Sequence, residues 1–230
     1  MTPLVMIPGM MCDDRIFEPQ IKGLSSMVEI HIADISKHGN MKDLAADVLR
    51  NAPPKFSLAG HSMGGIVAME VCLQAPNRIE KLALIDTNPM AELEEVKLNR
   101  ERQMSEALSG KLTNVIREEM KPQYLADSDN SDTILNICME MAISLGPKTF
   151  INQSKALQGR VDQQKTLKSI DIPVLIMCGL EDKLCSVEKH ELMHNIISNS
   201  TLEVIKNAGH LPTLEQPEQT TEVLKKWLMN

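Results

Sequence analysis

The stretch Phe56–Gly65, with the sequence FSLAGHSMGG, decides the fold of this chain. Its first residues predict an apolar strand, and its last residues begin a predicted helix. Between them, Gly60-x-Ser62-x-Gly64 has the spacing of a nucleophile elbow, a sharp turn from strand to helix. The central residue of such a turn is strained, so the residues two before and two after it must be nearly without side chains. The sequence therefore predicts that Ser62 Oγ stands clear at the carboxyl end of a strand, above a helix N-terminus that favours negative charge.

The same five residues also fit an ordinary Gly/Ser loop between a strand and a helix. The pattern of the remaining chain decides between the two interpretations. Strands alternate with helices, which predicts a parallel sheet with right-handed crossovers. The six predicted strands lie at residues 4–7, 27–32, 56–59, 81–85, 174–178 and 201–205, and the helices around them at residues 13–24, 41–49, 63–72, 187–197 and 220–228.

An all-helical segment interrupts this alternation after the fourth strand. Residues 90–159 show only helical periodicity, with helices expected at 91–108, 111–120, 131–145 and 148–157. The third of these is apolar nearly all round and must be covered on more than one side. We therefore expect an α/β core made of residues 1–89 and 160–230, with residues 90–159 inserted as a helical cap.

Three strand-end turns carry reactive side chains: Ser62, Asp182 and His210. In an open parallel sheet, sites form outside the carboxyl ends of the strands. A serine hydroxyl needs a base within hydrogen-bond reach, and that base needs an acceptor that fixes its tautomer. Serine, aspartate and histidine in this order along the chain match the order found in α/β-hydrolases.

The chain resembles the α/β-hydrolase family, in particular its esterase/lipase-like group. The matching segments span the chain except for the insertion; they are Ile7–Met10, Gly60–Gly65, Leu84–Thr87, Pro173–Gly179 with Asp182, Ala208–His210 and Leu214–Pro217. The resemblance implies an α/β-hydrolase fold, with about six mostly parallel strands flanked by helices and a helical cap after the fourth strand.

The resemblance also implies roles for individual residues. Ser62 would be the nucleophile, His210 the base and Asp182 its orienting acid. The oxyanion hole would consist of the backbone N–H groups of Met10 and Met63. Two features depart from the family pattern: Pro8 stands where the family usually has histidine, and the chain starts at the strand before the oxyanion loop, without the usual leading hairpin.

Several residues near these motifs have competing interpretations. Asp86 also ends a strand, and some relatives take their acid there; we favour Asp182 and expect Asp86 to cap its turn. His61 should point away from Ser62 Oγ and pack under the elbow. Cys185 is expected to be a small wall residue of the pocket, since no basic partner is evident.

The run His190–His194 spells HExxH, the pattern of a metalloprotease helix. Both imidazoles would lie within one helical turn. However, Glu191 points nearly opposite the apolar face of this helix, into solvent, whereas a zinc site needs a pocket, a third ligand and a buried base. We therefore predict no metal site, and the triad chemistry needs no cofactor.

Composition limits the other functional classes. Of 230 residues, 43% are hydrophobic and 24% charged, which is ordinary for a globular domain. The net charge of −7 without a basic run argues against nucleic acid or an anionic membrane as partner. No apolar stretch approaches the roughly 20 residues of a membrane span. The five scattered cysteines lack a CxxC pair, and the N-terminus lacks a signal-peptide pattern, so we expect a cytoplasmic protein. A homodimer is left open.

We predict a serine hydrolase that cleaves a small carboxylic ester or thioester through an acyl-enzyme. The alternatives are other triad chemistries, namely C–C hydrolysis, lactone opening, acyl transfer or cofactor-free haloperoxidation, and a small-ligand receptor on a hydrolase scaffold. Met11, Met139 and Met141 are the expected substrate-pocket residues. Because the motifs place no basic residue beside Ser62, the pocket should prefer uncharged acyl groups.

Overall fold

The computed structural model describes residues 2–120, 123–127 and 130–230. Its centre is a six-stranded sheet in the order β2-β1-β3-β4-β5-β6, and every strand pairing is parallel. The predicted α/β fold is confirmed. The strands are β1 (Leu4–Ile7), β2 (Ile30–Ile32), β3 (Phe56–His61), β4 (Ile79–Ile85), β5 (Val174–Gly179) and β6 (Ser200–Ile205).

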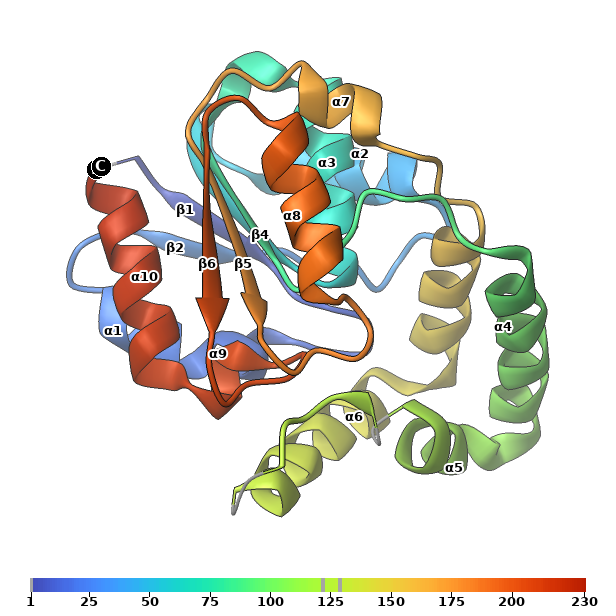
Figure 1. The fold of residues 1–230 in the computed structure, drawn as a ribbon. Helices are drawn as coiled ribbons and strands as arrows, with labels where there is room; N and C mark the ends of the chain where they lie inside the picture. The colour runs from blue at the N-terminus through green and yellow to red at the C-terminus, as the bar shows by residue number, and fades with distance from the viewer. Residues whose placement is uncertain (1, 121–122, 128–129) are drawn as a thin grey trace.

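Helices cover both faces of the sheet (Figure 1). On one face lie α1 (Glu18–Leu24) and α10 (Pro217–Met229), and on the other lie α2 (Met41–Asn51), α3 (Met63–Gln74) and α8 (Val187–Ile196). Strands β1 and β5 are apolar throughout because both of their faces are buried, whereas the edge strand β6 carries polar residues and is only partly buried. This arrangement produces two apolar clusters, one on each side of the sheet.

Strand β1 illustrates how the sequence divides between these clusters. Val5 and Ile7 belong to the cluster with α2 and α3, whereas Leu4 and Met6 belong to the cluster with α1 and α10. Successive side chains of a strand point to opposite faces, so a continuous apolar run supplies both. All four residues are at most 2% exposed.

Several element boundaries differ from the predicted ones. Strand β2 is limited to three residues at the sheet edge. The first helix begins as the 3₁₀ turn η1 (Asp14–Phe17), where Asp13 accepts a hydrogen bond from the Arg15 N–H. Helix α10 begins at Pro217, because proline suits the first turn of a helix. The short elements η2 (Pro76–Arg78) and α9 (Pro212–Glu215) were not predicted.

The segment between β4 and β5 is helical, and Figure 1 shows it beside the carboxyl ends of the strands. It contains α4 (Glu94–Glu106), the π-helical turn η3 (Ala107–Lys111), α5 (Leu112–Asn114), the π-helical turn η4 (Val115–Met120), α6 (Ser131–Gln158) and α7 (Gln164–Lys168). The segment predicted as a helix at 111–120 is helical, but only Leu112–Asn114 is α-helical and the remainder forms wider π-helical turns. Gly110 has a φ of +88°, and the chain after it forms wide turns with only one short α-helical stretch.

Helix α6 combines the two helices predicted at 131–145 and 148–157. Gly146, with a φ of +73°, kinks the helix just before Pro147, which cannot donate a backbone hydrogen bond. Side chains of α6 enter both apolar clusters, including Met139 in one and Met141 in the other. The helix is therefore covered on more than one side, as its composition requires.

By length and composition alone, α6 is long and apolar enough to cross a membrane, although the sequence analysis expected no apolar stretch of that length. This is weak evidence for a membrane span, since core helices pass the same test. The kink at Gly146 divides the apolar length.

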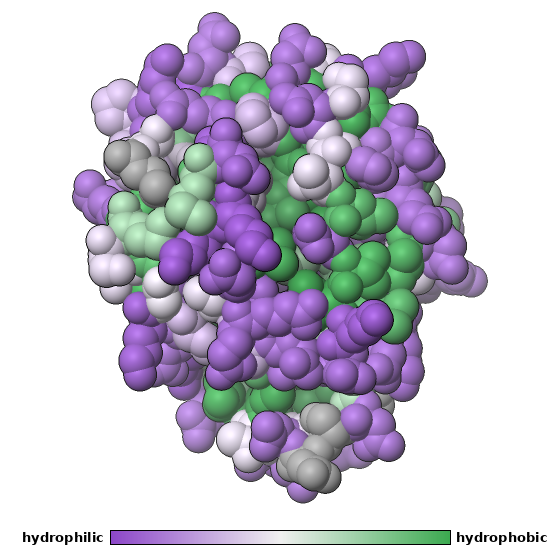
Figure 2. All heavy atoms as spheres, turned by 60° about the vertical axis from the view of Figure 1, so that its left-hand side comes forward, coloured by the Kyte–Doolittle hydropathy of each residue, from purple (hydrophilic) through white to green (hydrophobic). Residues whose placement is uncertain are grey.

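Hydrophilic side chains cover most of the face in Figure 2, with hydrophobic ones visible between them. Among the described residues, the exposed large hydrophobic side chains include Leu73 on α3, Leu98 on α4 and Ile143 on α6. Single exposed side chains of this kind need no functional explanation.

Candidate active site

The turn between β3 and α3 has the geometry expected of a nucleophile elbow. Ser62 has a φ of +53° and a ψ of −119°, a strained conformation for a residue with a side chain. A Cβ atom at Gly60 would lie 2.4 Å from the Gly64 carbonyl oxygen, and one at Gly64 would lie 2.1 Å from the Ile7 carbonyl oxygen. Only glycine fits at these two positions, so β1, β3 and α3 can approach closely around Ser62.

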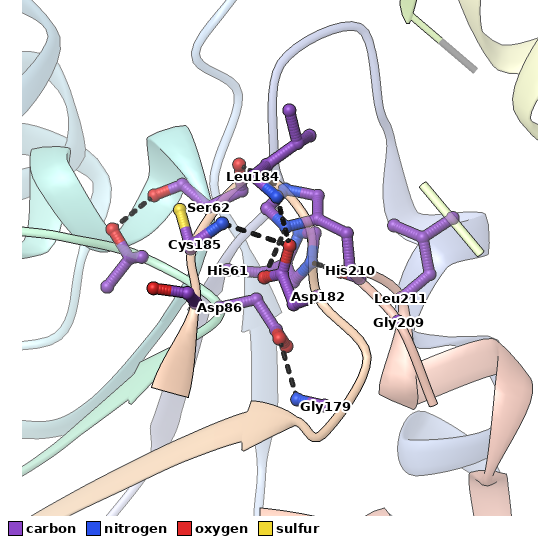
Figure 3. Close-up of polar contacts among 12 residues, drawn as sticks. His61, Ser62, Asp86, Gly179, Asp182, Leu184, Cys185, Gly209, His210 and Leu211 are labelled. Carbon is purple, nitrogen blue, oxygen red and sulfur yellow. Dashed lines mark hydrogen bonds and ion pairs between the residues drawn. The ribbon is translucent and has the colours of Figure 1, made fainter. Parts of the chain in front are cut away.

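The structure brings Ser62, His210 and Asp182 together in one chain of hydrogen bonds (Figure 3). His210 Nε2 lies 2.8 Å from Ser62 Oγ, and His210 Nδ1 lies 2.8 Å from Asp182 Oδ2. The imidazole and the carboxylate are almost completely buried. The three side chains come from the turns after β3, β5 and β6, at one edge of the sheet.

Asp182 is held in the ionised form by its neighbours. Its Oδ1 accepts backbone N–H hydrogen bonds from Leu184 at 2.8 Å and Cys185 at 3.0 Å (Figure 3). Burial alone would raise the pKa of Asp182, but the His210 ring and these N–H groups outweigh it, so that the pKa is lowered. This carboxylate is thus oriented by its own turn and faces the ring.

Asp86, the competing acid, faces a different partner. Its Oδ1 accepts the Gly179 N–H at 2.9 Å, and its Oδ2 has no hydrogen-bond partner among the described residues. The carboxyl group is fully buried, and its pKa is well above the usual value because of burial and the nearby charge of Asp182. The side chain bridges to β5 and does not cap its own turn as expected.

His61 lies beneath the elbow and not against Ser62 Oγ. Its Nε2 donates to the carbonyl oxygen of His210 at 2.7 Å, and the ring is 1% exposed. Burial, together with the proximity of His210, lowers the pKa of His61 to about 3. A neutral His61 therefore supports the backbone of the loop that carries His210.

Glu215 holds the His210 loop, and the sequence analysis assigned it no role. Its carboxylate accepts the N–H groups of Gly209 and Leu211, which flank His210, and the Ala126 N–H from the helical segment. Glu215 lies in the segment Leu214–Pro217, which matches the α/β-hydrolase family, and this match was the one sequence feature that could have suggested a role for it. Burial raises the pKa of Glu215 despite these donors.

The two N–H groups expected to form the oxyanion hole lie in a tight turn and at a helix N-terminus. Met63 is the first residue of α3, where a helix leaves N–H groups without intrahelical acceptors. Met10 lies in a turn closed by the Cys12 N–H and the Gly9 carbonyl at 3.2 Å. Its neighbour Met11 has a φ of +55° and donates its N–H to Gln153 Oε1 of α6 at 2.8 Å. Thus α6 helps to fix this loop.

A cavity of about 580 Å³ opens beside Ser62 and His210. It is lined by both the sheet core and the helical segment, and many of its lining residues are apolar, among them Met10, Met63 and Met90. The lining also contains the basic residues Arg100, Arg160 and Lys189, which the motifs did not place there. Cys185 is one of the wall residues, and burial raises the pKa of its thiol to about 12.

The three expected pocket residues Met11, Met139 and Met141 lie elsewhere. None of them is among the described residues that line the cavity. Met11 and Met139 pack in one apolar cluster, and Met141 packs in the other, where its Sδ accepts the Asp13 N–H at 3.4 Å. Helical periodicity shows that α6 is buried, but it does not show which side faces a pocket.

The HExxH run does not assemble a metal site. His190 Nε2 accepts the Thr87 N–H at 3.1 Å, and its Nδ1 donates to the Ser186 carbonyl, so that neither ring nitrogen has a free lone pair. His194 contacts Ser200 Oγ instead. Within the described ranges, the group with metal-ligand spacing is Asp182, Cys185 and His210, whose ligand atoms lie within 4.8 Å of one another. Two of its members are already hydrogen-bonded to each other.

Comparisons with known proteins agree with this fold. A family model described as serine aminopeptidase, S33 (Hydrolase_4) matches residues 21–217. The pimeloyl-[acyl-carrier protein] methyl ester esterase of Aliivibrio salmonicida is 24% identical over 238 residues, covering 98% of this chain and 91% of the relative.

Solved structures give the same picture. A thermophilic esterase from Thermogutta terrifontis, solved with malate bound, is 26% identical with a TM-score of 0.91, and the match covers 100% of this chain and 90% of that one. The enol-lactonase of Burkholderia xenovorans LB400 is 17% identical with a TM-score of 0.84, covering 100% of this chain and 92% of that one, which shows the shared fold. With a family model spanning most of its length, the chain belongs to the S33 serine aminopeptidase (Hydrolase_4) family of α/β-hydrolases and is a hydrolase.

Proposed function

We propose that this chain is a serine esterase that cleaves a small carboxylic ester or thioester, with a mainly apolar acyl part, through an acyl-enzyme. The observation that carries the proposal is the hydrogen-bonded chain from Asp182 through His210 to Ser62, with both contacts at 2.8 Å. In this proposal His210 accepts the Ser62 proton as Ser62 Oγ attacks the carbonyl carbon. Asp182 keeps the ring in the tautomer whose Nε2 can accept that proton.

The attack moves negative charge onto the former carbonyl oxygen, next to the N-terminus of α3. The proposed donors to this oxyanion are the backbone N–H groups of Met10 and Met63. His210 then passes the proton to the leaving alcohol or thiol, and the acyl group stays on Ser62. A water molecule that gives up a proton to His210 hydrolyses the acyl-enzyme and restores Ser62. No step is assigned to a cofactor.

The charges around the cavity favour an ester over a peptide with a free N-terminus. An aminopeptidase must bind an α-ammonium group, which calls for an available carboxylate. The two glutamates that line the cavity are both paired with arginine: Glu92 with Arg100 and Arg160, and Glu119 with Arg102. The esterase relatives support the same choice, since their printed names describe ester hydrolysis.

We further propose that residues 90–159 act as the cap that gives the enzyme its selectivity, above a core of residues 1–89 and 160–230. The support for this division is that the cavity walls include Leu93, Val96 and Tyr124 from the helical segment opposite Ser62. The cavity volume of about 580 Å³ falls within the range of small-molecule sites.

The test is turnover of p-nitrophenyl esters from acetate to octanoate and of the matching acyl thioesters. We expect many turnovers per protein molecule and an initial burst of p-nitrophenol that corresponds to the acyl-enzyme. A fluorophosphonate probe should add once, at Ser62, and labelling should disappear in Ser62→Ala but persist in Ser144→Ala, an exposed serine of α6. A single stalled adduct without turnover would contradict the esterase proposal and favour a receptor.

A further inference from the structure

Two arginines in the cavity wall share one carboxylate. Glu92 Oε2 accepts Arg100 Nε at 2.8 Å, and Glu92 Oε1 accepts Arg160 Nη2 at 2.9 Å. All three side chains are largely buried, with exposed fractions of 16% for Arg100, 10% for Arg160 and 5% for Glu92. The cluster therefore carries two positive charges and one negative charge in a place with little access to solvent.

No second acid among the described residues of the cavity wall offsets the extra charge. Glu119 is the other acidic lining residue, and it is paired with Arg102 and with the amide of Gln103. Lys189 adds a further positive charge to the wall, and its Nζ donates to the Leu184 carbonyl. The cavity beside the reactive serine thus has a net positive wall, although the chain as a whole carries a charge of −7.

The guanidinium of Arg160 has unused hydrogen-bonding capacity. Its Nε is buried and has no hydrogen-bond partner within the described part of the chain. Burial lowers the pKa of Arg160 despite the opposing effect of Glu92, but an arginine side chain stays protonated in proteins. A largely buried guanidinium in a cavity wall is complementary to an anionic ligand, because guanidinium forms strong charge-assisted hydrogen bonds with carboxylates.

Arg100 contacts the side chain of a residue whose backbone belongs to the proposed oxyanion hole. Its Nη1 lies 3.6 Å from Sδ of Met10, whose backbone N–H is a proposed oxyanion donor. The Met10 side chain is therefore the spacer between the cluster and the oxyanion position. An anionic group bound at the cluster would be connected to the scissile carbonyl by a short aliphatic chain.

We propose that Arg100 and Arg160 form an anion subsite, and that the preferred substrate is an ester whose acyl chain ends in a carboxylate. Met10, Met63 and Met90 would contact the methylene groups of such a chain. This inference rests on the proposed esterase function and specifies its substrate class. It replaces the sequence-based expectation that the pocket prefers wholly uncharged acyl groups.

The first experiment uses the wild-type protein and two matched methyl esters. One is monomethyl adipate, which ends in a carboxylate; the other is its primary amide, which has the same shape without the charge. We expect kcat/KM to be about ten- to a hundredfold higher for the carboxylate, the range for hydrogen bonds to charged groups. Equal or lower kcat/KM for the carboxylate would overturn the anion subsite while leaving the esterase function intact.

The second experiment assigns the preference to the cluster. In Arg160→Gln and Arg100→Gln, the carboxylate-to-amide ratio of kcat/KM should fall towards one. Lys97→Gln is the matched control, since Lys97 lies on the same helix as Arg100, pairs with the exposed Glu94 and is absent from the cavity lining. A ratio that stays at the wild-type value in both cluster variants would contradict the proposal.

Binding separates this inference from the esterase function and does not depend on the variants folding. The ligands are 6-oxoheptanoate, in which a ketone that cannot be hydrolysed replaces the methyl ester of monomethyl adipate, and its primary amide. Calorimetric titration of the wild-type protein should show at least tenfold tighter binding of the carboxylate. Tighter binding of the carboxylate without turnover of either ester would retain the anion subsite and reject the esterase proposal. Equal binding of the two compounds together with turnover of the esters would reject the anion subsite and retain the esterase proposal.

Discussion

The sheet core and the helical insertion meet at the same cavity but contribute different kinds of groups to it. The core supplies Ser62, Asp182 and His210 from short turns whose backbone is fixed by the sheet. The insertion and the segment that follows it supply Arg100 and Arg160, long side chains that reach the cavity from helices and loops. In the proposed function, the reaction type therefore resides in backbone turns, whereas substrate choice resides in side chains that can change without altering those turns.

The largest expected effect concerns the core. Ser62→Ala should lower kcat by at least about 10⁴-fold, because no other group in the turn can form the acyl-enzyme. Steady-state hydrolysis of p-nitrophenyl butyrate measures this loss, with circular dichroism as a check of the fold. A variant that keeps more than a hundredth of the wild-type kcat would show that the nucleophile is not Ser62. A small residual rate is expected, since binding and the oxyanion hole alone can exceed water by about 10³-fold.

The next effect compares two carboxylates at neighbouring strand ends. Asp182→Asn should lower kcat by up to about 10⁴-fold, because an amide no longer fixes the required His210 tautomer. Asp86→Asn should lower kcat much less, because Asp86 bonds Gly179 and not the ring. Parallel kinetics on the two folded variants make the comparison. The reverse ranking would place the acid after β4 instead of β5.

A third effect should appear when the pH is lowered, and it concerns a buried histidine of the core. No histidine lies within residues 90–159, whereas burial lowers the pKa of His190 to about 4 from its usual 6.5. Between these two pH values the unfolded state binds a proton at this position that the native state does not. The contribution of the neutral His190 ring to the free energy of unfolding is therefore fully present above pH 6.5. It falls by about 1.4 kcal/mol per pH unit as the pH drops below that value.

Urea unfolding of wild type and His190→Gln from pH 7 to pH 4.5 measures this contribution. As the pH falls, the free energy of unfolding should decrease more for the wild type than for His190→Gln. His194→Gln is the control, since the His194 side chain is exposed and is hydrogen-bonded to Ser200 at the surface. A pH-independent difference for His190→Gln would mean that folding does not shift the pKa of His190.

The smallest effect tests the connection between the two regions. Gln153 of α6 accepts the Met11 N–H and donates to the Ile35 carbonyl, two backbone groups of the core. Gln153→Leu should lower the free energy of unfolding by about 1–3 kcal/mol, because both buried groups lose their partner. Gln158→Leu is the matched control within the same helix, since the side-chain amide of Gln158 donates to the Lys97 carbonyl of α4, within the insertion.

Thermal or urea unfolding followed by circular dichroism provides this measurement. Equal losses in the two glutamine variants would mean that the bonds to the core add nothing beyond those within the insertion. A second, separate transition in Gln153→Leu would indicate that the insertion and the core then unfold independently.

Much of the core could be predicted because its signals are local. Apolar runs of four to six residues predict buried strands, and the spacing of Gly60, Ser62 and Gly64 follows from contacts within one turn. The meeting of Ser62 with Asp182 and His210 follows from the rule that parallel strands end at one edge. These rules need no knowledge of side-chain packing.

The insertion could be predicted only in outline because its contacts depend on packing. Gly110 and Gly146 interrupt the helices at positions where periodicity alone cannot fix the geometry. Met139 was expected in the pocket but packs against the core, whereas Arg100 was expected in no particular place and lines the cavity. Which face of a helix meets a cavity depends on how its neighbours dock, and that information is not local in the sequence.

The contacts of the His210 loop with residues 124–126 limit how this enzyme can be re-engineered. The His210 N–H is bonded to the Tyr124 carbonyl at 2.6 Å, and Glu215 accepts the Ala126 N–H at 2.7 Å. A cap transplanted from a relative would remove both backbone partners along with the walls of the pocket. Chimaeras should therefore keep residues 123–127 with the host core and exchange only the helices on either side of them.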